Sequence, residues 1–173
     1  SAKSEKSLKK HLVDLIKSQT GMVIATTFAS NIARLKTLAD AAIAADRSIV
    51  LLGRAMRRMI ELGLETGILN DFPNVVSPAQ ALDLPRSHIF IFSTGSQGQR
   101  RAASAQLSNG KYRGIVLKEG DMFLFSSKTI PGNEVGVNRV INNLSKRNID
   151  VVENEGDRYH VSGHANRSEI TQI

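Results

Sequence analysis

The chain has 173 residues, 41% of them hydrophobic, and we predict a single domain over residues 1–173, since this length suits one complete core. It has no cysteine, which excludes disulfides and thiolate metal sites; no signal region or ~18-residue apolar run occurs, so we expect a soluble, cytoplasmic protein with no membrane partner. The net charge of +7 attracts polyanions such as nucleic acid, although a basic surface can also serve solubility alone.

Helical and extended patterns alternate along the chain. In chain order the spacing predicts helices over residues 5–18, 30–46, 54–67, 99–110 and 135–147, and strands over residues 21–28, 48–53, 88–95, 121–127 and 149–152. Either Ser30 or Asn31 suits the cap of the second helix. The residues of that helix that we expect to face the core are Ile32, Leu35, Leu38, Ala42 and Ile43.

This alternation defines the fold class. Short, almost continuously apolar strands between helices are typical of a parallel sheet that is covered on both faces. We therefore predict an α/β fold of the Rossmann-like, doubly wound type, with three layers and a mainly parallel sheet. No repeat, low-complexity segment or linker interrupts it.

Three predicted strands are followed by small polar residues that lead into a helix. These segments are Thr26–Asn31, Ser93–Gln99 and Ser126–Glu134. Helix N-termini with hydroxyls and glycines bind anions well, and parallel topology brings such loops to one edge of the sheet, so phosphate is the natural ligand. Each loop taken singly is also explained by ordinary capping and turn chemistry. None has the spacing of a P-loop or of the dinucleotide-binding fingerprint.

The four histidines fall into two groups. His11, in the first helix, and His88, at the start of a strand, have no partner in the sequence pattern and are interpreted as structural. His160 and His164 flank Ser162 and Gly163 after the last predicted strand, which suggests a loop that offers imidazole, hydroxyl and backbone N–H to an oxyanion. As a metal site this pair is incomplete, so we predict no metal bound by this chain alone.

Four segments carry a family resemblance: "TTFASNIARL", "TGSQGQ", "IPGNE" and "SGHA", in this order. Together they resemble the β-CASP domain of the RNase J family, which are metallo-β-lactamase-fold ribonucleases of bacteria and archaea. The resemblance spans essentially residues 5–170. In that family the β-CASP domain is inserted into a metallo-β-lactamase domain, and a metal-activated hydroxide cuts RNA in the cleft between the two domains.

The resemblance implies that this chain is an excised β-CASP domain. The family's HxHxDH metal motif is not in the sequence, nor is the further metal-ligand histidine that follows SGH. The implied parent is an endoribonuclease and 5′-to-3′ exoribonuclease that uses Zn²⁺ or Mn²⁺, acts on single-stranded RNA with a preference for a 5′-monophosphate, and forms a homo-oligomer. The chain itself, without its metallo-β-lactamase partner domain, is expected to be inactive.

The resemblance also implies roles for individual residues. His164 matches the motif histidine that contacts the scissile phosphate or assists proton transfer, without being a principal metal ligand. Substrate-binding roles fall on Ala29, Ser30 and Asn31, where the 5′-phosphate would be received, and on His160, Val161, Ser162 and Gly163, which would hold the phosphate backbone.

The segment Ser96, Gln97 and Gly98 is a possible phosphate loop, with turn and packing roles as the alternative. Gln99 stands where the family usually has an acidic residue. Two other functions remain open, a self-contained nucleotide- or phosphosugar-binding regulatory domain and a structural or partner-binding module. The first alternative does not explain the basic charge or the terminal "HVSGH".

Overall fold

The computed structural model describes residues 2–155, 158–162 and 170–171. Its helices are α1 (Ala2–Lys17), α2 (Ile32–Ala44), α3 (Arg54–Glu65), α4 (Pro78–Ala81), the 3₁₀ helix η1 (Arg86–His88), α5 (Ala103–Asn109) and α6 (Glu134–Lys146). Its strands are β1 (Val23–Thr26), β2 (Ser48–Leu52), β3 (Val75–Val76), β4 (Ile89–Ser93), β5 (Lys111–Tyr112), β6 (Ile115–Val116), β7 (Met122–Phe125), β8 (Asp150–Glu155), β9 (Arg158–Ser162) and β10 (Ile170–Thr171).

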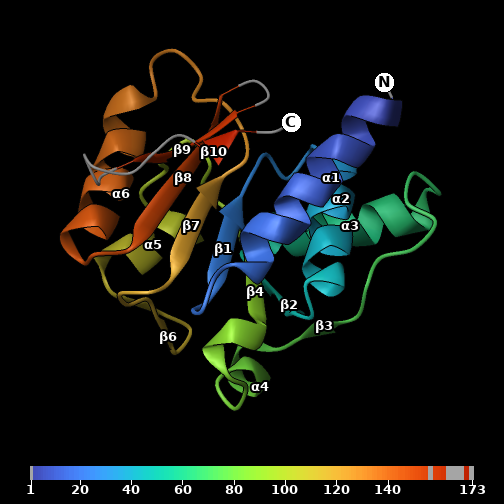
Figure 1. The fold of residues 1–173 in the computed structure, drawn as a ribbon, viewed down its shortest axis with the longest axis horizontal. Helices are drawn as coiled ribbons and strands as arrows, with labels where there is room; N and C mark the ends of the chain where they lie inside the picture. The colour runs from blue at the N-terminus through green and yellow to red at the C-terminus, as the bar shows by residue number, and fades with distance from the viewer. Residues whose placement is uncertain (1, 156–157, 163–169, 172–173) are drawn as a thin grey trace.

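One sheet runs through the centre of the molecule (Figure 1), with the strand order β10-β9-β8-β7-β1-β4-β2-β3. The six strands from β8 to β3 are all parallel, whereas β9 is antiparallel to β8 and β10 is antiparallel to β9. Strands β5 and β6 form a separate hairpin. This arrangement confirms the predicted doubly wound α/β class.

Helices cover both faces of the sheet, because successive residues of each buried strand point to opposite sides. Val23 and Ala25 of β1 pack in one core with α1, α2 and α3. Ile24, between them, packs in the other core with α5 and α6. In Figure 1 these two helical layers lie on opposite sides of the strands, which gives the predicted three layers.

Several local predictions were wrong. Ile43 does not face the core but is 49% exposed, because it lies next to Ala42 near the end of α2 and points away from the face that Ala42 buries. His88 belongs to η1, before β4 begins. Helix α5 starts at Ala103 and not at residue 99. The Thr94 hydroxyl lies at this start and accepts a hydrogen bond from the Ala103 N–H. No helix among the described residues is long and apolar enough to cross a bilayer.

A buried arginine holds the amino edge of the sheet together. The Arg47 side chain is 3% exposed, and its guanidinium donates to the carbonyl oxygens of Ile16 (3.1 Å), Gln19 (2.7 Å), Gly21 (2.7 Å) and Ile89 (3.0 Å). These carbonyls belong to the end of α1, the turn after it and strand β4. Burial lowers the Arg47 pKa, and the nearby Asp121 carboxylate opposes that shift.

Asp121 is a buried negative charge of this edge. Its carboxylate accepts the main-chain N–H groups of Met22 at 2.7 Å and of Lys118 at 2.8 Å, and it forms an ion pair with Arg86. The carboxylate is fully buried, so these bonds replace the water that it loses on folding.

Replacing Arg47 with Met should destabilise the fold strongly, because several buried carbonyl oxygens would lose their donor while the apolar stem is kept. We expect the free energy of unfolding to fall by about 3 kcal/mol or more, measured by urea denaturation. Lys10→Met, at an exposed cation of α1, is the control and should change it by less than about 0.5 kcal/mol. Equal, small effects of the two substitutions would contradict the structural role of Arg47.

Candidate functional site

The loops that follow β1, β4 and β7 meet at the carboxyl edge of the sheet. Strand β1 lies between the other two, and Thr26, its last residue, is in register with Ser93 on one side and Phe125 on the other. The Thr26 hydroxyl donates to the Ser93 carbonyl at 2.7 Å, and the Ser126 N–H donates to the Thr26 carbonyl at 2.9 Å. The three polar loops predicted to share one edge therefore do so.

The loop after β1 presents its polar residues progressively to solvent. Thr27 is buried, Ala29 is half-buried, and Ser30 and Asn31 are exposed. Asn31, and not Ser30, caps α2, because its side-chain oxygen accepts the Arg34 N–H at 3.2 Å. The Ser30 hydroxyl is thus left at the surface, beside the start of α2.

Arg34 is a residue of this edge that the sequence analysis missed. It lies in the first turn of α2, which contains no acidic residue, and its guanidinium donates to the Ser126 hydroxyl at 3.0 Å. It therefore joins the start of α2 to the loop after β7. The available signal was a cation in the first helical turn, where the helix dipole disfavours positive charge.

The loop after β4 is fixed by the side chain of Gln97, which is buried. Its carbonyl oxygen accepts the Ile130 N–H at 2.8 Å and the Asn133 amide at 3.2 Å, and its own amide donates to the Lys128 carbonyl at 3.0 Å. Both ends of the side chain are engaged within the protein. Ser96 is also buried, so these contacts support the packing interpretation of residues 96–98 over the phosphate loop.

Gly98 brings the same loop against α6. It has a φ of +74°, and a Cβ placed on it would lie 2.3 Å from the carbonyl carbon of Gly136. Arg139 of α6 donates to the Gly98 carbonyl at 3.2 Å. Two backbones therefore touch here: Gly98 has no room for a Cβ, and a Cβ on Gly136 would lie 3.0 Å from the Gly98 carbonyl oxygen.

Gly98→Ala should be far more damaging than an alanine at another left-handed glycine. It adds a methyl group in contact with backbone atoms as well as backbone strain, so we expect a loss of about 3 kcal/mol in unfolding free energy. Gly67→Ala is the control, because Gly67 has a φ of +80° but nothing within 4 Å of the added Cβ, and it should cost about 1 kcal/mol. Urea denaturation of both variants measures the difference, and similar losses would refute the close contact.

The second predicted substrate segment lies in a different place from the first. The sequence predicted a loop, but His160, Val161 and Ser162 form part of strand β9, which runs antiparallel to β8 and pairs Ser162 with Val151. The end of β9 is therefore near the amino end of β8, while Ser30 follows the carboxyl end of β1. Among the described residues the two segments are not brought together; Gly163 and His164 lie outside the described residues.

The part of the chain that the structure describes contains no cluster of three or more His, Asp or Glu side chains able to hold a metal ion. His11 is half-buried in α1, and His88 lies in η1 at the opposite edge from the polar loops. These residues do not fit a zinc or manganese site.

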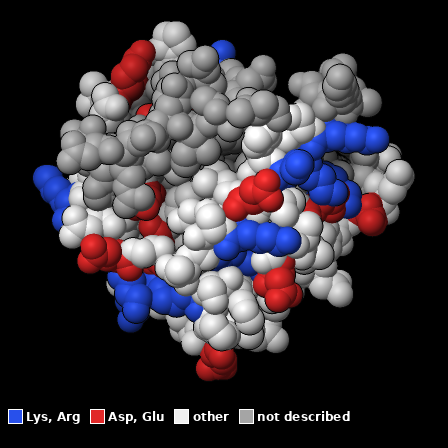
Figure 2. All heavy atoms as spheres, viewed as in Figure 1, with Lys and Arg blue, Asp and Glu red and all other residues white. Residues whose placement is uncertain are grey.

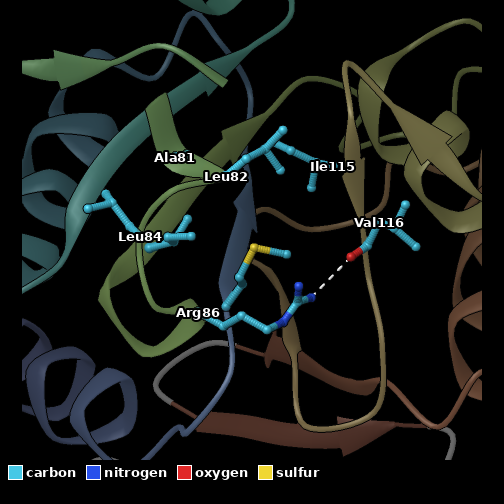
Figure 3. A pocket seen from close by; sticks show the side chains of 8 residues that line it. Ala81, Leu82, Leu84, Arg86, Ile115 and Val116 are labelled. Atoms are coloured by element: carbon cyan, nitrogen blue, oxygen red, sulfur yellow. Dashed lines mark hydrogen bonds between the residues drawn. The ribbon is translucent and has the colours of Figure 1, made fainter. Parts of the chain in front are cut away.

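A small pocket lies at the amino edge (Figure 3), between α4 and the β5–β6 hairpin. Leu82, Ile115 and Val116 line it together with Arg86, which donates to the Val116 carbonyl at 3.0 Å. Its volume is about 80 Å³, well below the roughly 300 Å³ of typical ligand sites. It is too small to hold a nucleotide.

The class that this structure defines is a doubly wound α/β domain whose polar loops gather at the carboxyl ends of the strands, the usual binding edge of such sheets. The family model "Ribonuclease J, beta-CASP domain" matches residues 20–144. The chain therefore belongs to the ribonuclease J β-CASP domain family, as the motifs had indicated.

Three relatives named as ribonucleases illustrate the similarity. Ribonuclease J of Sinorhizobium meliloti is 35% identical over 98% of this chain, Ribonuclease J 1 of Streptococcus pyogenes 36% over 96%, and Ribonuclease J of Mycolicibacterium smegmatis 39% over 96%. In each case the matched region is 30% of the relative. The chain thus spans less than a third of the length of these proteins.

Proposed function

We propose that this chain is the RNA-binding part of a parent ribonuclease J. The parent hydrolyses phosphodiester bonds of RNA, both within the RNA chain and from its 5′ end. Membership of the family supports the parent's activity. The observation that carries the binding role is the loop after β1, which exposes the Ser30 hydroxyl beside the start of α2, where no acidic residue offsets the positive end of the helix.

In this proposal the terminal phosphate of single-stranded RNA is received at Ala29–Asn31. The Ser30 hydroxyl and nearby main-chain N–H groups donate to phosphate oxygens, which fixes the RNA without reading its sequence. Arg34 lies one turn further along α2 and adds positive charge to the same edge. RNA with a 5′-hydroxyl end lacks the negative charge of the terminal phosphate, so it should bind less tightly.

The segment His160–His164 is proposed as a second contact, with His164 near the scissile phosphate, on the strength of the family motif alone. We propose that the zinc or manganese ligands belong to a metallo-β-lactamase domain of the parent, since the described residues do not fit such a site. The parent is proposed to be a homo-oligomer. The alternative, a domain for a small phosphorylated metabolite, loses support because Gln97 is occupied by protein contacts.

An NMR titration of the labelled chain with a short RNA tests the binding role. We expect saturable shifts at Ser30 and Asn31 that are larger with a 5′-monophosphate than with a 5′-hydroxyl on the same RNA. Ser30→Ala should weaken binding about tenfold to a hundredfold, the loss of one hydrogen bond to a charged group. Stronger binding of a small phosphosugar than of RNA would contradict the proposal and favour the metabolite-binding alternative.

The same titration reports on the second contact. Shifts at Ser162 that accompany those at Ser30 would support one continuous site formed on binding. Shifts at Ser30 without any at Ser162 would restrict the site in this chain to the loop after β1.

The chain alone should not hydrolyse RNA, because it offers no described metal site and its proposed partner domain is separate. Incubation of the pure chain with labelled RNA and Zn²⁺ or Mn²⁺ should leave the RNA intact. Metal-dependent hydrolysis that His164→Ala abolishes would overturn this expectation.

A further inference from the structure

Five exposed arginines lie on two neighbouring connections of the carboxyl edge. Three are at the start of α3, directly after β2, and two are in the loop after β4. Among the described residues none of the five forms an ion pair, since the salt bridges there involve only Lys36 and Arg86 as cations. We call this set the arginine patch: Arg54, Arg57, Arg58, Arg100 and Arg101.

The two connections touch each other. Strands β2 and β4 are paired, with Leu52 in register with Ser93, and the Thr94 N–H donates to the Leu52 carbonyl at 3.1 Å. A Cβ placed on Gly53 would lie 2.4 Å from the Thr94 side chain. Strand β4 also pairs with β1, so the arginine patch lies at the same edge of the sheet as Ser30, on the side away from β7.

Helix stability does not explain the arginines of α3. Its first turn has no acidic residue. Arg54 and Arg58 are four positions apart, so each repels the other, and Arg54, in the first turn, also opposes the helix dipole. Met56, Ile60 and Gly63 are the buried residues of this helix, and all three arginines are exposed. Glu61 and Glu65, further along α3, form no ion pair with them.

On the described part of the face drawn in Figure 2, lysines and arginines lie next to acidic residues. The arginine patch, by contrast, has five cations on two short connections. A polyanion, whose negative charges repeat along one chain, can neutralise several of these arginines at once.

We propose that the arginine patch binds the phosphate backbone of the RNA chain beyond its 5′-terminal nucleotides, which extends the site from the loop after β1 across β4 to β2. This inference rests on the proposed RNA-binding function. One guanidinium group can donate two parallel hydrogen bonds to the oxygens of a phosphate. Such contacts do not depend on the base sequence of the RNA. Longer RNA therefore binds more tightly than a trinucleotide, and the gain depends on salt.

The test uses fluorescence anisotropy with a 5′-monophosphorylated oligouridylate dodecamer over a series of salt concentrations. The variants Arg57→Gln/Arg58→Gln and Arg100→Gln/Arg101→Gln each remove two charges from the patch. The control Lys111→Gln/Lys118→Gln removes the same charge from two exposed lysines on and next to the β5–β6 hairpin. Urea denaturation checks that every variant is folded.

Each patch variant should weaken dodecamer binding about tenfold at 0.1 M salt and lower the slope of log affinity against log salt by about 1.4, or roughly 0.7 for each lost contact. Binding of a 5′-phosphorylated trinucleotide, followed by NMR at Ser30, should not change, and the control should lose less than about threefold of its affinity.

Two results would overturn the inference while leaving RNA binding intact: unchanged dodecamer affinity in both patch variants, which would point to an acidic protein surface as their partner, or an equal loss in the control. Absence of any RNA binding by the unmodified chain would instead refute the proposed function.

Discussion

Parallel pairing of β1 with β4 on one side and β7 on the other is the constraint on which the candidate site depends. Parallel neighbours cannot be joined by a tight turn, so each strand is followed by a loop and a crossover helix, and every loop of this kind leaves from the same edge. Segments distant in sequence, such as residues 27–31 and 126–133, are therefore brought side by side. The topology alone therefore places these loops together, whatever side chains they carry.

The two edges of the sheet are held by different means. At the amino edge, buried ionised groups bond largely to the main chain: Arg47 donates to carbonyl oxygens, and Asp121 accepts two N–H groups besides its ion pair with Arg86. At the carboxyl edge, a neutral amide, Gln97, and the contact of Gly98 with Gly136 fix the loops. Arg34 and Arg139 add hydrogen bonds to the Ser126 hydroxyl and the Gly98 carbonyl, so the charged groups among these contacts are cations, and they add to the attraction of this edge for anions.

Periodicity was enough to predict the central strands, the helices that cover them and the fold class, because burial on both faces leaves a clear apolar pattern. It did not predict β3, α4, β5 and β6, which are too short to show a period. The capping loops and their shared edge were predictable from residue type and topology. The roles of Arg47 and Gln97 were not predictable, because each depends on carbonyl or amide groups that the tertiary structure brings near. Spacing along the sequence does not show which groups these are. Antiparallel β9 was likewise missed, because "YHVSGH" contains the glycine and polar residues of a loop.

The hydrogen bonds of Arg47 reach beyond the residues that the family model matches. The match to the family begins at residue 20, yet this guanidinium is bound by the carbonyls of Ile16 and Gln19, and Leu12 and Ile16 of α1 pack in the same core as α2. Removing the first nineteen residues would leave a buried cation with fewer acceptors and would open one face of the core to water. The smallest piece that can fold as described is accordingly larger than the piece that the family model matches, and boundaries for expression should be set by burial.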